Sequence, residues 1–167
     1  TKISKRDISI INKNFNIEKI VSFHGIKKGI ENTNYLLKSK NKKYILTIFE
    51  KRVSKKEIPF FMKLMDILNR SKINCPKPLK TNNKSYIIKL KNKSACIVSF
   101  LEGKDKKLLS TNDCFAVGKS IARMHLITKK IKLNRKNSMG IDNLEPMLKG
   151  IKFKSKENSN LKIFLKK

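Results

Sequence analysis

The sequence predicts an α+β fold, in which a five-stranded antiparallel sheet with one inserted helix is followed by the beginning of a helical region. Short segments rich in β-branched and aromatic residues, separated by turns that contain Gly and Asn, are typical of antiparallel strands. Between the third and fourth of these segments, and again after the fifth, apolar residues recur at the spacing of an amphipathic helix. The chain has 167 residues, 39% of them apolar, which is enough for one ordinary domain or two small lobes.

A short helix is expected before the sheet. Residues 4–7 have the pattern of a capping box, and Ile8, Ile11 and Phe15 follow on one helical face. Three strands come next, and their expected ranges are 20–25, 34–39 and 43–49.

The inserted helix is expected over residues 54–69, with its apolar side chains on one face. Ser54 and Glu57 have the spacing of a capping box. Pro59, however, fits best in the first turn of a helix, so the regular helix is expected to begin nearer Ile58.

Two further strands complete the sheet, at residues 85–90 and 93–100. After a polar connector, a second capping box at residues 110–113 opens a largely apolar helix that runs to about Thr128. The rest of the chain is weakly patterned, with one helical turn expected at residues 144–150. This order divides the chain into two predicted parts. They are a lobe of residues 1–101 that holds the whole sheet, and residues 102–167, which form a connector and the beginning of a helical lobe.

The net charge of +29, from 41 basic and 12 acidic residues, raises the question of a nucleic-acid partner. The cations are spread over nearly every turn and solvent face, and only five are arginine, the residue best suited to phosphate and base contacts. Lys, Asn and Ile are also the residues that A- and T-rich codons encode. We therefore expect genome composition to explain the charge and expect no nucleic-acid partner. A lysine-rich nucleic-acid-binding module remains the alternative.

The apolar runs are far shorter than the roughly 20 residues that a membrane-spanning helix needs, so no membrane association is expected. The first residues lack the apolar core of a signal sequence, and the chain is expected to be cytoplasmic. Cys75, Cys96 and Cys114 are odd in number and widely spaced, which fits reduced thiols better than a disulfide framework or a metal knuckle.

Six motifs follow one another along the chain in unbroken order. They are Gly29-Ile-Glu-Asn-Thr-Asn-Tyr35, Tyr44-Ile-Leu-Thr-Ile-Phe-Glu50, Ile58-Pro-Phe-Phe-Met-Lys-Leu-Met65, Cys75-Pro-Lys-Pro78, Val98-Ser-Phe-Leu-Glu-Gly103 and Val117-Gly-Lys-Ser-Ile-Ala-Arg-Met-His-Leu126. With them the chain resembles, over residues 5–145, the bacterial homoserine kinases of the aminoglycoside-phosphotransferase-like superfamily. The order of elements is that of the small lobe of a protein-kinase-like fold.

The resemblance implies that the turn between the first two strands lies over the triphosphate of ATP. Such a turn needs Gly29 for close backbone approach, and it needs amide or hydroxyl donors such as Asn32, Thr33 and Asn34. The alternative is an Asn-rich loop that binds no ligand, since Asn is common throughout this chain.

On the third strand, alternation places Ile45 and Thr47 on one face, and the resemblance implies that this face is turned towards the nucleotide. Thr47 stands where protein kinases have a lysine that contacts the ATP phosphates, and it cannot supply the charge. Either the family does without that lysine, or Lys28 or Lys38 replaces it. Glu57 is the counterpart of the helix glutamate that orients the lysine, or simply a capping residue.

The resemblance also implies a hinge at the end of the fifth strand. Backbone groups of Ser99 and around Leu101 are expected to bind the edge of the adenine base. His24 and His125 do not open the His-x-Asp pattern of a catalytic loop and are expected to be structural. The family's catalytic loop and metal ligands lie beyond the matching residues, so no catalytic or metal-binding residue is assigned here, and the chain alone is expected to show no turnover.

The function implied by the resemblance is phosphorylation of the hydroxyl of L-homoserine, a step towards threonine, with ATP and Mg²⁺ as cofactors. Other small-molecule kinases of the superfamily, acting on choline, methylthioribose or an aminoglycoside, remain alternatives. The residues present do not define the acceptor or the oligomeric state.

Overall fold

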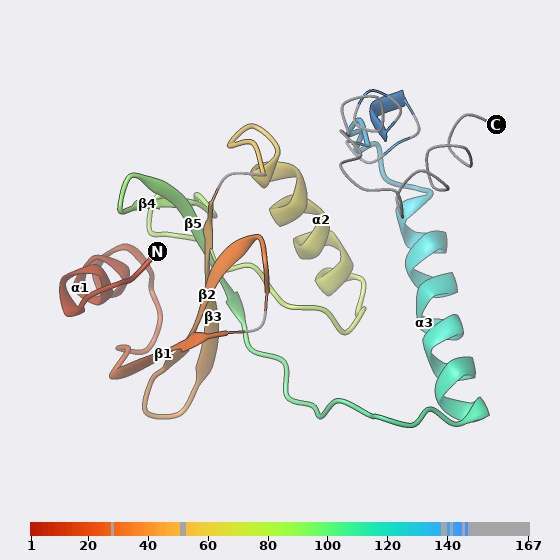
Figure 1. Ribbon diagram of the computed structural model, residues 1–167, viewed down its shortest axis with the longest axis horizontal. Helices are drawn as coiled ribbons and strands as arrows, with labels where there is room; N and C mark the ends of the chain where they lie inside the picture. The colour runs from red at the N-terminus through yellow and green to blue at the C-terminus, as the bar shows by residue number, and fades with distance from the viewer. Residues whose placement is uncertain (28, 51–52, 138–139, 141, 145, 147–167) are drawn as a thin grey trace, which may run out of the picture. The chain divides into compact units, whose positions relative to one another are not determined.

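The computed structural model describes residues 1–27, 29–50, 53–137, 140, 142–144 and 146 (Figure 1). The elements follow in the order α1 (Lys5–Asn14), β1 (Ser22–Ile26), β2 (Asn32–Lys38), β3 (Lys43–Phe49), α2 (Ile58–Arg70), β4 (Ile88–Leu90), β5 (Lys93–Ser99) and α3 (Thr111–Thr128). The α+β fold predicted from the sequence is confirmed. The chain forms two compact units, residues 1–133 and 134–167. The sequence-based division at residue 101 stays a prediction.

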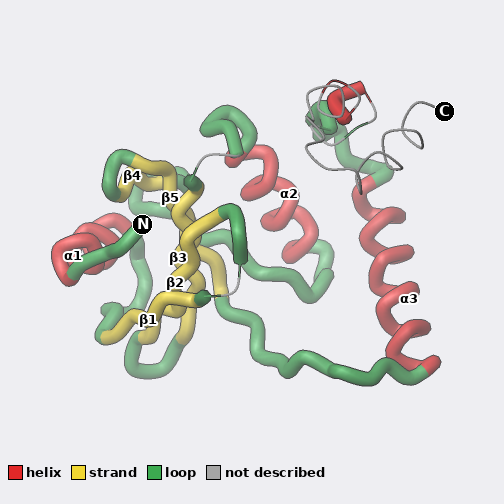
Figure 2. The backbone as a smooth tube through the Cα atoms, viewed as in Figure 1, coloured by secondary structure: helices red, strands yellow, loops and turns green. Residues whose placement is uncertain are grey.

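The five strands form one antiparallel sheet in the order β1-β2-β3-β5-β4 (Figure 2). β3 has a partner on each edge, because its Thr47 lies opposite Asn34 of β2 and Cys96 of β5. The connection from β3 to β5 passes through α2 and β4, which explains why a helix interrupts the run of strands in the sequence.

Alternation along the strands gives the sheet two packed faces. One face bears Leu37, Leu46 and Ile97, which are fully buried in a core that also contains Ile8 and Ile11 of α1. The other face packs on α2, in a cluster whose buried members are Ile58, Met62, Cys96 and Val98. Figure 1 shows α1 and α2 on opposite sides of the sheet. The two faces therefore use alternate residues of the same strands.

The capping box predicted before α1 is confirmed, since Ser4 and Asp7 satisfy each other's backbone groups. The one predicted for α2 is wrong. Glu57 is the N-cap residue, and the Ser54 hydroxyl accepts from the backbone N–H of Lys56 at 3.3 Å. The reason is Pro59, which starts the helix at Ile58 and leaves Ser54 too far upstream for its hydroxyl to reach the third helical N–H.

Several strand boundaries differ from the predicted ones. β4 is shorter, because the backbone N–H of Ile87 donates to the Ser85 hydroxyl at 3.1 Å in a local turn. β2 begins at Asn32, two residues earlier than expected, because Asn32 and Thr33 already pair with Phe49 and Ile48 of β3. Only residues 27–31 connect β1 to β2.

The last helix of the first unit, α3, has the predicted capping box of Ser110 and Asp113 and ends at Thr128 as expected. None of its residues is buried, and Phe115 is 71% exposed. His24 and His125 are exposed as well. Among the described residues, no helix is both long and apolar enough to cross a membrane.

In the second unit, residues 142–144 are helical. The Asn143 side-chain amide donates to the carbonyl of Asn137 at 2.9 Å, and the backbone N–H of Leu144 donates to the carbonyl of Gly140 at 3.1 Å. The helical turn predicted at residues 144–150 lies mostly outside the described residues.

The core around β3 leads to a stability prediction. Leu46→Ala should lower the free energy of unfolding by about 2 to 5 kcal/mol, because a fully buried leucine leaves a cavity. Leu108→Ala is the matched control, and it should change stability by about 0.5 kcal/mol or less, since Leu108 is 89% exposed. Urea titration of the 167-residue chain measures both. Equal losses in the two variants would contradict the assigned core.

Candidate functional site

A pair of polar side chains lies on the α2 face of the sheet, where β2 and β3 run together. Asn34 and Thr47 are direct neighbours in the register, and the Thr47 hydroxyl donates to Oδ1 of Asn34 at 2.9 Å. Ile45, two residues before Thr47, lies on the same face next to Val98 of β5. On this face the polar pair therefore lies between two apolar groups, Phe49 on the side of the β1–β2 turn and Ile45 with Val98 towards the C-terminus of β5.

Gly29 brings the β1–β2 turn against this polar pair. Its φ is +123°, a conformation that residues with a side chain rarely adopt. A Cβ atom added to Gly29 would stand 3.5 Å from Nδ2 of Asn34, so the backbone of the turn passes close to that amide. The structure thus groups four residues that the sequence singled out, which are Gly29, Asn34, Ile45 and Thr47.

Thr33 and Ser99 lie elsewhere. The Thr33 hydroxyl donates to the carboxylate of Glu50 at 2.5 Å, on the α1 face of the sheet. Ser99 is bonded to Lys77, because its hydroxyl accepts from the Lys77 N–H and its own N–H donates to the Lys77 carbonyl, both at 2.9 Å. Neither side chain joins the group around Asn34.

Asn32 and Leu101 lie at the two edges of this region, Asn32 at the start of β2 and Leu101 just after β5. Oδ1 of Asn32 accepts from the backbone N–H of Glu50 at 3.4 Å, which ties the start of β2 to the end of β3. Leu101 follows the end of β5, and 40% of its surface is exposed. The preceding N–H, that of Phe100, donates to the carbonyl of Lys43 at 3.3 Å, so regular pairing with β3 extends to the residue before Leu101.

An apolar recess of about 310 Å³ adjoins Thr47 between the sheet and α2. Phe61, Met65 and Val98 are among its lining residues, together with Cys96. Burial raises the pKa of the Cys96 thiol to about 12, so the thiol stays protonated at neutral pH. Because the thiolate is the reactive form, Cys96 acts as an apolar wall and not as a nucleophile.

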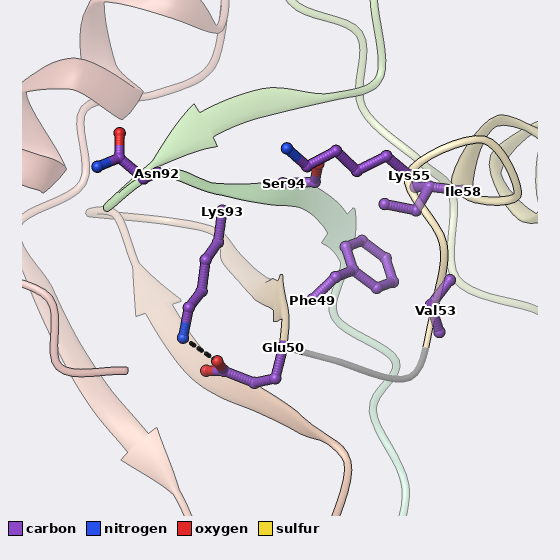
Figure 3. Close-up of a pocket in the computed structure, with 8 residues that line it drawn as sticks. All are labelled: Phe49, Glu50, Val53, Lys55, Ile58, Asn92, Lys93 and Ser94. Atoms are coloured by element: carbon purple, nitrogen blue, oxygen red, sulfur yellow. Dashed lines mark hydrogen bonds and ion pairs between the residues drawn. The ribbon is translucent and has the colours of Figure 1, made fainter.

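A second, smaller recess of about 110 Å³ lies beyond the end of β3 (Figure 3). Its wall includes Glu50 and Lys93, and the Lys93 ammonium forms an ion pair with the Glu50 carboxylate. Lys93 first, and then the hydroxyls of Thr1 and Thr33, hold the pKa of Glu50 far below its usual range. The carboxylate is therefore ionised at every physiological pH.

Lys28 and Lys38 were the two lysines expected as possible replacements for a lysine on the third strand, and the structure describes only Lys38. Lys38 is exposed at the other end of β2, four residues from Asn34, which corresponds to about 13 Å along a strand. This distance makes it a poor neighbour for Thr47. Lys28 lies outside the described residues. The half-buried Glu57 accepts from the backbone N–H of Ser54 at 3.3 Å, in a contact local to the start of α2.

No cluster of three or more His, Cys, Asp or Glu side chains in the described part of the chain could hold a metal ion. No catalytic step through a metal follows from them.

The Glu50–Lys93 pair was not anticipated from the sequence. The sequence alone carries no signal for this pair, because the β3–β5 register, with Ile48 opposite Ala95, is known only from the structure. Continuing this register by two residues places Glu50 opposite Lys93, and opposite charges on facing residues are a common stabilising pair in antiparallel sheets.

Comparison with known proteins agrees with this architecture. Homoserine kinase of Bartonella tribocorum is 36% identical over 141 residues, which cover 84% of this chain and 44% of that protein. Homoserine kinase of Methylocella silvestris is 32% identical over 157 residues, covering 94% of this chain and 49% of that protein. The chain thus spans about half the length of the curated relatives it matches.

Solved structures show the same fold at low identity. A spectinomycin phosphotransferase bound to ADP and spectinomycin superposes with a TM-score of 0.64 and 14% identity, covering 99% of this chain and 54% of that one. An amicoumacin kinase bound to AMP-PNP and Ca²⁺ gives a TM-score of 0.65 and 16% identity, covering 91% and 55%. A family model described as the phosphotransferase enzyme family matches residues 22–149. The chain belongs to this phosphotransferase enzyme family.

Proposed function

We propose that this chain forms the nucleotide-binding part of a homoserine kinase, which transfers the terminal phosphoryl group of ATP to the hydroxyl of L-homoserine. The observation that carries the nucleotide site is the grouping of Gly29, Asn34 and Thr47 beside the apolar side chains of one sheet face. The choice of homoserine is supported by relatives that are 32% and 36% identical over most of this chain.

The site fits ATP in its chemistry. The turn at Gly29 offers backbone N–H groups at a position without a side chain, and Asn34 and Thr47 add an amide and a hydroxyl for phosphate oxygens. The apolar side chains of Ile45 and Val98 suit the faces of the adenine ring, and backbone groups around Leu101 suit its polar edge. ATP, when bound, supplies the phosphoryl group. The residues of this chain position it and exclude water.

The side chains of Asn34 and Thr47 are neutral, whereas a triphosphate carries several negative charges. The net charge of +29 offsets this difference at long range, since a strongly positive protein raises the local concentration of anions.

We also propose that the enzyme uses Mg²⁺. The ADP, AMP-PNP and Ca²⁺ in the two solved neighbours support nucleotide and divalent-cation use.

The proposed division of labour follows from the same features. Residues 1–101 contain the whole sheet and every residue assigned here to the nucleotide site, apart from the groups that flank Leu101. Residues 102–167 supply the connector and the start of a helical lobe, where α3 has no buried residue within this chain. In this proposal the acceptor site belongs to the remaining part of the lobe.

Removing the Asn34 amide should weaken ATP binding. In the full-length enzyme, Asn34→Ala should raise the KM for ATP about ten- to a hundredfold, because one lost hydrogen bond to a charged group costs about 1.5 to 3 kcal/mol. The control Asn83→Ala removes an amide from an exposed turn and should leave the KM unchanged. Steady-state kinetics with melting curves for both variants measure the effect. A less stable Asn34→Ala enzyme with a normal KM for ATP would sink the phosphate-site assignment.

Acceptor specificity is tested on the full-length wild-type enzyme. With ATP and Mg²⁺ present, coupled ADP release should give a kcat/KM for L-homoserine at least about a hundredfold above that for choline, methylthioribose or an aminoglycoside, because a site built to bind both charged ends of an amino acid rejects molecules lacking them. Preference for another of these acceptors would replace homoserine kinase by a different small-molecule kinase. Tight, salt-sensitive duplex binding unaffected by ATP, with no ADP release, would favour the nucleic-acid module.

A further inference from the structure

Glu50 connects the end of β3 to the beginning of β2 through both its side chain and its backbone. Its carboxylate accepts from the Thr33 hydroxyl at 2.5 Å, and its backbone N–H donates to Oδ1 of Asn32 at 3.4 Å. The same carboxylate accepts from the Thr1 hydroxyl at 2.6 Å and from the Lys93 ammonium. One residue therefore holds two consecutive residues of β2 at the point where the strand leaves the β1–β2 turn.

The charge state of Glu50 makes this contact directional. Lys93 and the neighbouring hydroxyls keep the carboxylate ionised, so it can only accept hydrogen bonds. The Thr33 hydroxyl must then donate to it, which fixes the direction of that side chain. Glu50 is only 22% exposed. Two cations balance its charge, Lys93 at the start of β5 (Figure 3) and the N-terminal ammonium of Thr1, whose nitrogen lies 3.1 Å from Oε1 of Glu50. Without Lys93, a half-buried carboxylate would lack its principal partner.

Thr33 lies between Asn32 and Asn34, and successive side chains of a strand point to opposite faces. Holding Thr33 on the α1 face therefore holds Asn34 on the α2 face, beside Thr47 and Gly29. Glu50 stays on the Thr33 side of the sheet, away from the proposed nucleotide. Its effect on the phosphates can only pass through β2.

We propose that Glu50 and Lys93 are positioning residues, which hold the start of β2 so that Asn34 and the Gly29 turn meet the phosphates of the nucleotide. This inference rests on the proposed nucleotide site. It assigns to the ion pair a role in nucleotide affinity beyond its role in stability.

The test uses the full-length enzyme with L-homoserine and ATP. Glu50→Gln and Lys93→Met should each raise the KM for ATP about five- to tenfold, while kcat and the KM for L-homoserine change less than about twofold. The KM for ATP of the double variant should lie within about twofold of that of the more affected single variant, because both changes break the same interaction. Lys93→Arg keeps the cation, so its KM for ATP should be close to that of the wild-type enzyme.

Two further variants separate positioning from folding. Thr33→Val keeps the ion pair and removes only the hydroxyl, so it should still raise the KM for ATP, while Thr33→Ser should not. Lys91→Met is the matched control, because Lys91 pairs with the carboxylate of Asp7, 3.5 Å away, on α1. It should lower the melting temperature without changing the KM for ATP.

Each outcome decides the matter. If the Glu50, Lys93 and Thr33 variants lose stability but keep the wild-type KM for ATP, the pair is purely structural and the inference is overturned. If Glu50→Gln and Lys93→Met do not fold, Thr33→Val alone decides it in the same way. A wild-type enzyme that binds no ATP by calorimetry would instead overturn the proposed function, and the inference with it.

Discussion

The pairing of β3 on both edges is the constraint on which the rest of the structure depends. Because Thr47 faces Asn34 on one side and Cys96 on the other, neither the register with β2 nor that with β5 can slip without moving Leu46 out of its core. A shift by one residue would also turn Thr47 away from α2. The position of the polar pair is thus fixed by apolar packing on the opposite face.

The same register explains why two polar groups with different chemistry lie so close in sequence. Thr47 and Asn34 are neutral, lie on the α2 face and are hydrogen-bonded to each other. Glu50 and Lys93 are charged and lie where β3 ends and β5 begins. They bond to each other, and Glu50 also accepts from the Thr33 hydroxyl. Strand β3 therefore carries Thr47 on one face and leads, three residues later, into Glu50 on the other.

Much of this fold could be predicted from the sequence, because its signals are local. The cap at Ser4, the alternation along β3 and the proline at position 59 each depend on a few neighbouring residues, and each is found as expected. The prediction failed where the outcome depends on pairing between distant segments. Asn32 and Thr33 look like turn residues by composition, yet they are strand residues because β3 is long enough to pair with them. Ser99 is bonded to Lys77 through a crossing segment that no periodicity reveals.

Composition also hides the lysine that pairs with Glu50. In a chain with 41 basic residues, no count or cluster distinguishes Lys93 from the others. Its distinction is geometric, since the β3–β5 register places it against one of only 12 acidic residues, at a carboxylate that also receives the Thr33 hydroxyl. A surplus of cations attracts carboxylates over the whole surface of such a protein, but it cannot orient them. Orientation requires a cation held at one place by a strand, and this is what separates Lys93 from the lysines of the turns.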